Sequence, residues 1–165
     1  MENNTLPENW KLNIDFKIPK FESTNFTIEL LNIDHLVKDY KAFMSSIEII
    51  NRTRNSQWPF EGFTIEENEE DLQWHNKENE ARRSMAFVVR ALNGEYAGCF
   101  YLYPIGVINK DIITPMGADV DVSWWVTQKA FDSGKYELLY SDIKTYLKSW
   151  PFNKPWYSNT IIPSN

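Results

Sequence analysis

Two aspartates stand two positions apart in a segment with the pattern of a β-strand. Asp119 and Asp121 alternate with the apolar Val120 and Val122 within residues 118–127, so both carboxylates lie on one face of the predicted strand. Two carboxylates in one enclosed cleft raise each other's pKa, and a raised pKa makes a carboxylate a better proton acceptor near pH 7. The same pattern suits a strand surface on which both face solvent, and the residues leave these alternatives open.

Other residues that often carry chemistry point to packing instead. Cys99 is the single cysteine, stands mid-strand and is expected in the core, with no His or Cys at metal-ligand spacing. No metal site and no internal disulfide are therefore expected. His35, at the start of a predicted helix, is expected to be a solvated first-turn residue.

Composition limits the class of protein. A chain of 165 residues suits one domain, and its aromatic content of 15% predicts aromatic pocket walls. Seventeen Lys and Arg against twenty-three Asp and Glu give a formal charge of −6 without a basic stripe, so no nucleic-acid partner is expected. The lone cysteine, the polar residues 1–11 and the lack of a long apolar run predict a cytoplasmic protein without a membrane partner.

The clearest predicted element is a β-hairpin over residues 85–103. Two apolar runs flank Asn93-Gly94, a pair that suits a type I′ turn, and Gly98 is expected to allow close approach of a neighbouring element. The loop over residues 105–117 that follows is long for a small domain and is expected to flank a site.

Helical periodicity predicts three helices around this hairpin. The first begins at Asp34 and keeps an apolar stripe to Ile50, and the second begins with a capping box formed by Thr64 and Glu67. The third begins after Asp132 or Ser133 and ends before Pro151. Strands are predicted over residues 26–31 and 154–162, and residues 1–20 are expected to form an N-terminal extension, an arm held to the surface by aromatic rings (Trp10, Phe16 and, just beyond it, Phe21).

This order of elements is similar to the core of the Gcn5-related N-acetyltransferase (GNAT) superfamily. Gly98 in the third strand, behind Glu95 and the Asn-Gly turn, followed by a strand, a turn and an amphipathic helix, resembles that family's hairpin and central motif. Four further segments resemble a poorly characterised bacterial branch of it: Trp58-Pro59, Thr64-Ile-Glu-Glu, Trp125-Val-Thr-Gln and Trp150-Pro-Phe. The likeness covers about residues 20–162. It implies an α/β (α+β) fold, a single GNAT-like domain over residues 21–165 with a mixed, mostly antiparallel sheet flanked by helices.

The resemblance also implies a coenzyme A site after the fourth strand. The family's turn reads Gln/Arg-x-x-Gly-x-Gly/Ala and holds the pyrophosphate on amides at a helix N-terminus. Here Phe131, Gly134 and Tyr136 stand at the three motif positions, so one of three is kept. Ser133, Gly134 and Lys135 are the expected cradle. The alternative is that Gly134 serves the turn alone and Tyr136 is core, because the helical stripe independently places Tyr136 inside.

Acetyl-CoA-dependent N-acetyl transfer by direct attack of an amine is the activity that the resemblance implies. Asp121, and secondarily Asp119, match the position of the family's carboxylate base. Trp125, Val126 and Thr127 match the strand that binds pantetheine, and Trp58 and Trp74 are expected to wall a pocket for a small-molecule or peptide amine of unknown identity. No residue matches the family's C-terminal tyrosine acid. A catalytically degenerate GNAT-fold module that binds a ligand or regulates is therefore the alternative, and a structural domain that uses its aromatic residues at an interface is a third.

Overall fold

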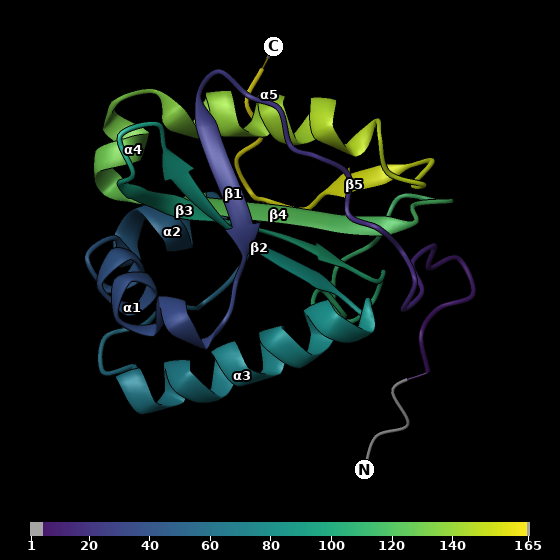
Figure 1. Cartoon of the computed structure of the whole chain (residues 1–165), viewed down its shortest axis with the longest axis horizontal. Coiled ribbons are helices and arrows are strands. Elements are labelled where there is room, and N and C mark those ends of the chain that lie inside the picture. The colour runs from purple at the N-terminus through teal and green to yellow at the C-terminus, as the bar shows by residue number, and fades with distance from the viewer. Residues whose placement is uncertain (1–4, 165) are drawn as a thin grey trace.

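The computed structural model describes residues 5–164 and contains one five-stranded sheet between two layers of helices (Figure 1). The strands lie in chain order; the first four are antiparallel and the last pair is parallel. The strands are β1 (Phe26–Leu30), β2 (Met85–Ala91), β3 (Tyr96–Tyr103), β4 (Val120–Val126) and β5 (Pro155–Tyr157). The helices are η1 (Ile33–His35), α1 (Leu36–Met44), α2 (Ile47–Thr53), α3 (Ile65–Ala81), α4 (Gln128–Asp132) and α5 (Lys135–Leu147). This mostly antiparallel mixed sheet is the predicted fold class.

The two sheet faces have separate hydrophobic cores. Helices α1, α2 and α3 cover one face, and α5 with the N-terminal arm covers the other (Figure 1). Trp124 of β4 packs with α5, whereas its neighbour Trp125 packs with α1 and α2. Alternation along β4 therefore continues as the sequence predicted, but both faces of the strand are buried.

The hairpin forms where it was predicted, with a different turn. Gly94 has φ +90°, whereas Asn93 lies outside the positive-φ region that a type I′ turn requires of both central residues. Gly94 N donates to Ala91 O and Ala91 N donates to Glu95 O, which closes a three-residue loop with a single left-handed residue at its end. Leu92 takes the extra loop position, so the type I′ prediction is wrong.

Gly98 lies against the backbone of β4. A Cβ atom at this position would stand 1.9 Å from Trp125 O, far inside van der Waals contact. The predicted close approach is confirmed, and the neighbour is β4.

The helix predicted over residues 34–50 is divided. Asn32 caps η1 at its start, and α1 and α2 are separated at Ser45 and Ser46. His35 is buried, accepts a hydrogen bond from Asn32 N at Nδ1, and places Nε2 3.1 Å from Glu29 Oε1. The expected solvated position of His35 is therefore wrong, because the side chain completes a capping box.

The predicted capping box of α3 is confirmed. Glu67 N donates to Thr64 Oγ1 at 3.1 Å, and Thr64 N donates to Glu67 Oε2 at 2.8 Å. Both bonds satisfy amides that a helix start leaves without partners.

The N-terminal arm is held by aromatic rings, as expected. Its rings meet rings of α5 and the segment after it: Trp10 with Phe152 at 5.4 Å, Phe16 with Trp150 at 5.0 Å and Phe21 with Tyr146 at 5.1 Å between centroids. Residues 1–4 and 165 of the two expected domain segments lie outside the described residues.

Candidate functional site

Asp121 is buried in β4 beneath two side chains. Ser158 Oγ donates to Asp121 Oδ1, and Asn109 Nδ2 donates to Asp121 Oδ2 at 2.8 Å. Burial raises the pKa of the Asp121 carboxyl, while the hydrogen bonds from Ser158 and Asn109 and the charge of Arg54 oppose that rise. The result is a carboxyl group with the raised pKa expected of a base, reached from outside through Ser158 and Asn109, which line a hollow.

Asp119 has a different environment. Its carboxylate accepts from Asn153 N at 2.7 Å and from Lys154 N at 2.9 Å, which fixes the turn before β5. Asp119 is not among the groups that shift the pKa of Asp121. Asp119 lies just before β4 and its carboxylate faces a different environment from that of Asp121, so the raised pKa of Asp121 comes from burial and not from its neighbour.

A polar cleft surrounds Arg54, just after α2. Arg54, Ser56 and Ile108 line each of three adjoining hollows, of about 210, 130 and 450 Å³. Ile108 and Asn109 come from the long loop that was expected to flank a site, and that loop does line this cleft.

The two tryptophans expected to wall a pocket lie in different places. Trp58 lines the 210 Å³ hollow and packs against Phe43, with 4.6 Å between the ring centroids. Trp74 is 41% exposed on α3 and is absent from that lining, whereas the next residue, His75, belongs to it. Burial and the charge of Arg54 lower the pKa of His75 to about 4, so its ring is neutral at pH 7.

Strands β4 and β5 separate beyond Val122. Ser158 N donates to Val122 O, and further along Thr127 N donates to Ala97 O on the opposite side of β4. Because backbone groups alternate in direction, Val122, Trp124 and Val126 face β5 whereas Trp125 and Thr127 face β3. Of the three residues expected to bind pantetheine, only Val126 turns its backbone toward the β5 side.

The side chain of Asn159 fills this separation. Trp124 N donates to Asn159 Oδ1 at 3.2 Å, and Asn159 Nδ2 donates to Trp124 O at 2.9 Å and to Tyr136 Oη at 2.8 Å. The amide thus pairs with β4 as another strand would. The predicted strand over residues 154–162 is accordingly short, because beyond β5 the chain turns and both Thr160 N and Ile161 N donate to Thr53 O.

No family model matches the sequence, and no curated protein matches it. Solved structures do match the fold. RimL, a ribosomal L7/L12 α-N-protein acetyltransferase in complex with coenzyme A, matches with a TM-score of 0.58 at 15% identity, over 79% of this chain and 66% of that one. An acetyltransferase from Salmonella typhimurium that modifies the N-terminal serine of ribosomal protein L7/L12 matches with a TM-score of 0.56 at 12% identity, over 76% of this chain and 65% of that one. The chain thus spans just under two thirds of these two structures.

Two further solved structures of similar fold are also acetyltransferases. The ribosomal-protein-S5-alanine acetyltransferase from Vibrio fischeri gives a TM-score of 0.55 at 17% identity, over 78% of this chain and 67% of that one. A GNAT-family acetyltransferase from Bordetella pertussis gives 0.52 at 10% identity, over 81% and 74%. The chain has the GNAT fold.

The GNAT fold implies coenzyme A as a ligand, but in this chain side chains fill the space between β4 and β5. In the GNAT fold pantetheine lies along β4, where this chain has Asn159. Tyr136 lies beside Asn159 and is 1% exposed; its ring packs against Trp124 with 5.1 Å between centroids, and its hydroxyl donates to Ile161 O at 2.6 Å. Its buried position is the one the helical stripe predicted.

The expected pyrophosphate cradle is also closed. Residues 128–132 form α4, and the amides of Ser133 and Gly134 donate to carbonyls of that helix. Gly134 has φ +78° and links α4 to α5. Gly134 therefore makes the turn, and two of the three expected cradle amides, those of Ser133 and Gly134, are already bonded to α4, whereas Lys135 is the first residue of α5.

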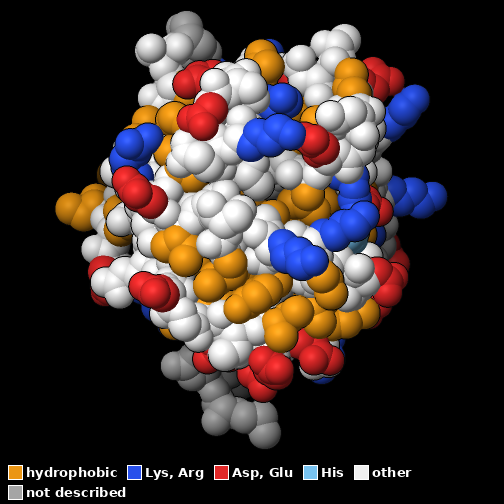
Figure 2. All heavy atoms as spheres, turned by 90° about the vertical axis from the view of Figure 1, so that its left-hand side faces the viewer, with side chains coloured by type: hydrophobic (Ala, Val, Ile, Leu, Met, Phe, Trp, Pro, Cys, Tyr) orange, Lys and Arg blue, Asp and Glu red, His pale blue; other side chains and the backbone are white. Residues whose placement is uncertain are grey.

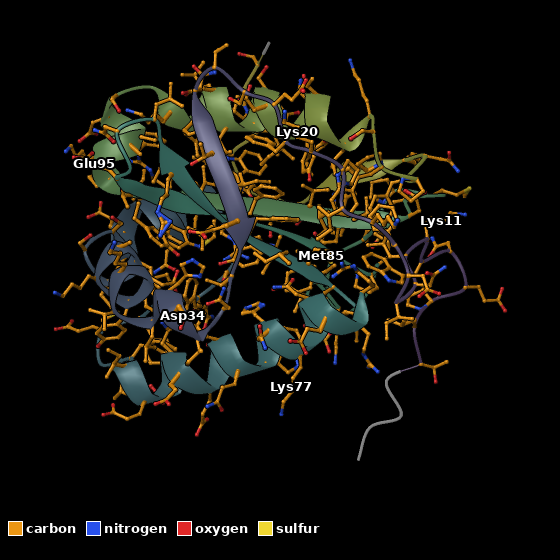
Figure 3. The ribbon with its side chains drawn as sticks, in the orientation of Figure 1. Lys11, Lys20, Asp34, Lys77, Met85 and Glu95 are labelled. Carbon is orange, nitrogen blue, oxygen red and sulfur yellow. The ribbon has the colours of Figure 1, made fainter. Side chains whose placement is uncertain are left out.

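The positive charge of Lys129, on the α4 side of the expected cradle, is paired with a carboxylate of the same chain. Lys129 Nζ lies 2.8 Å from Glu95 Oε1, and Glu95 is labelled at the α4 end of the sheet in Figure 3. The hydrogen bond from Lys129, together with its charge, lowers the pKa of Glu95. On the surface around α1 and α4, Lys and Arg side chains alternate with acidic and apolar ones (Figure 2). The residues present do not fit a coenzyme A pyrophosphate held in the manner of the GNAT fold.

Sequence reasoning missed several residues of this site. Arg54, Ser158 and Asn159 come from two separate segments, and none belongs to a recognisable motif, whereas His75 stands beside Trp74 on a helix whose positions could be expected to line a cleft. Ser158-Asn159 lies within the strand predicted over residues 154–162 and directly follows the shorter β5; two adjacent polar residues inside a predicted strand are the signal that could have drawn attention to the open edge of β4. None of the described helices is long and apolar enough to cross a bilayer.

Proposed function

We propose that this chain is a GNAT-fold ligand-binding module that does not hold coenzyme A between β4 and β5. The observation that carries the proposal is the pair of hydrogen bonds from Asn159 to the backbone of Trp124, continued by Tyr136. This was the alternative that the eroded motif already indicated. The ligand site in this proposal is the cleft at Arg54, which stays open while the coenzyme groove is filled.

An energetic argument supports the same conclusion. Pantetheine could reach β4 only after the two bonds between Asn159 and Trp124, the bond between Asn159 and Tyr136, and the bond from Tyr136 to Ile161 O are broken. Each of these four hydrogen bonds contributes about 1 kcal/mol net, so opening the space between β4 and β5 costs about 4 kcal/mol. That cost weakens binding roughly a thousandfold, before the loss of aromatic packing at Tyr136 is counted.

Titration with acetyl-CoA tests the proposal, with binding followed by calorimetry and by tryptophan fluorescence. We expect no saturable binding below millimolar ligand. Tyr136→Gly should improve binding if the tyrosine is the obstruction and the folded state survives, as checked by circular dichroism; Gly134→Val should not improve it. Micromolar binding by the unchanged chain would overturn the proposal.

The second candidate is an acetyl-CoA-dependent N-acetyltransferase acting on a small-molecule or peptide amine. Two observations favour it: the structures of similar fold are acetyltransferases, and the buried Asp121 with a raised pKa receives a hydrogen bond from Ser158, whose side chain lines the cleft. Asp121 would accept a proton from an amine in the cleft by way of the Ser158 hydroxyl.

A screen of amines with acetyl-CoA tests this candidate. If any amine is acetylated, Asp121→Asn should lower the rate roughly 10²-fold or more. A variant that keeps the full rate would move the role to water or to Asp119, and a screen without turnover, in a protein shown to be folded, would favour the binding module.

A further inference from the structure

The hollow of about 210 Å³ lined by residues of α3 and β3 is one part of the Arg54 cleft. Its volume is below that of most sites for drug-sized ligands, so it suits a small molecule. Both charged and aromatic side chains line it, among them Arg54, Trp58, Asp71, His75, Tyr101 and Tyr103.

Arg54 brings a positive charge to this hollow. Its guanidinium donates to Ser123 Oγ at 3.2 Å and lies over the Tyr101 ring at 4.9 Å, and within residues 5–164 no carboxylate forms an ion pair with it. A partly buried guanidinium retains unused N–H donors in a planar fork, and a carboxylate matches that fork with two parallel hydrogen bonds.

Two more polar atoms of the same lining are buried without partners in the described part of the chain. These are Trp58 Nε1, which can only donate, and His75 Nδ1. Buried polar groups nearly always have partners, so two buried atoms without partners, beside a guanidinium that has spare N–H donors, indicate a ligand with hydrogen-bonding oxygens. His75 is neutral at pH 7, which leaves Arg54 as the cation of this lining.

Asp71 gives the hollow its opposite charge. Burial and the neighbouring acids Glu70, Asp39 and Glu67 raise the pKa of Asp71. An ammonium group would relieve that repulsion, whereas a second negative charge on the ligand would increase it. Asp39 also lines the hollow, but it is 3% exposed and accepts hydrogen bonds from Asn68 and Tyr96, so Asp71 is the carboxylate that a ligand can meet. Arg54 and Asp71 therefore complement a ligand with one charge of each sign, and the two carboxyl groups oppose a phosphate dianion.

We propose that this hollow binds a small zwitterion of the amino-acid class, with its carboxylate on Arg54 and its ammonium group toward Asp71. The inference rests on the proposed function, because it names the ligand class of the cleft described there.

Calorimetry with three probes of one carbon skeleton tests the inference: L-leucine, L-leucinamide, which lacks the carboxylate, and 4-methylpentanoate, which lacks the ammonium group. We expect leucine to bind at least tenfold more tightly than either. Arg54→Gln should remove the advantage of leucine over leucinamide, and Asp71→Asn should remove its advantage over 4-methylpentanoate. Circular dichroism checks that both variants fold.

The inference would be overturned if leucinamide bound as tightly as leucine, or if leucine bound to Arg54→Gln as it does to the unchanged protein. It would also be overturned if none of the three probes bound at concentrations of about 10 mM. Displacement of leucine by inorganic phosphate at equal concentration would also overturn it, in favour of a phosphate site. The two experiments test different proposals. Tight binding of acetyl-CoA would contradict the proposed function, whereas the three leucine-related probes test only which ligand binds in this hollow.

Discussion

The side-chain amide of Asn159 binds both backbone groups of Trp124, with 3.2 Å from Trp124 N to Oδ1 and 2.9 Å from Nδ2 to Trp124 O. One side chain thus replaces a strand residue at the point where β4 and β5 separate. Because Asn159 also donates to Tyr136 Oη, the same amide ties the sheet to α5.

Asn159→Ala should lower the free energy of unfolding by roughly 2–4 kcal/mol, because it leaves two buried backbone groups of Trp124 without partners. Urea denaturation followed by tryptophan fluorescence measures the loss. Asn55→Ala, at an exposed position, is the matched control and should change stability by less than about 0.5 kcal/mol. Equal stabilities of the two variants would contradict the strand-like role of Asn159.

Gly98→Ala should destabilise the protein by more than about 3 kcal/mol, because the new Cβ would collide with Trp125 O and β3 would have to move away from β4. Thermal unfolding measures it. A Gly98→Ala protein with the melting temperature of the wild type would show that β3 and β4 are not this close.

The hairpin loop gives a test that distinguishes the two turn types. Gly94→Val should cost more than about 1 kcal/mol, because φ at Gly94 is +90°. In the observed loop Asn93→Ala loses only the hydrogen bond from Glu95 N to Asn93 Oδ1, whereas in a type I′ turn it would also strain the backbone. Asn93→Ala should therefore cost clearly less than Gly94→Ala, and equal costs would restore the type I′ turn.

Stability should fall on acidification through His75. Its pKa is lowered from 6.5 to about 4 in the folded protein, so between these values the unfolded chain binds a proton that the folded chain does not. The wild type should lose roughly 1–3 kcal/mol relative to His75→Gln as the pH falls from 6.5 to 4. Denaturation curves of both proteins at several pH values measure it, and parallel pH profiles would show that His75 titrates normally.

Local patterns predicted the elements well. The hairpin, the capping box of α3, the alternation in β4 and the stripe of α5 depend on neighbours in sequence, where spacing alone carries the signal. His35 was misjudged because its partner Glu29 lies on the preceding strand, and the break between α1 and α2 because the apolar stripe continues across it.

The site was predictable only in part. Asp121 and the loop bearing Asn109 were found from the sequence, because strand alternation and loop length are local properties. Arg54 and His75 meet only after α2, α3 and β3 pack together, so no spacing along the chain could place them in one hollow. The position of Gly134 could not by itself distinguish a phosphate cradle from a turn, since both require a glycine there.

The aromatic contacts of the N-terminal arm also have a consequence for folding during translation. Trp10, Phe16 and Phe21 pack against Phe152, Trp150 and Tyr146, which leave the ribosome long after the arm does. During translation the aromatic rings of the arm therefore stay exposed, available to chaperones, until residues 146–152 have been synthesised and the core on the α5 side can close.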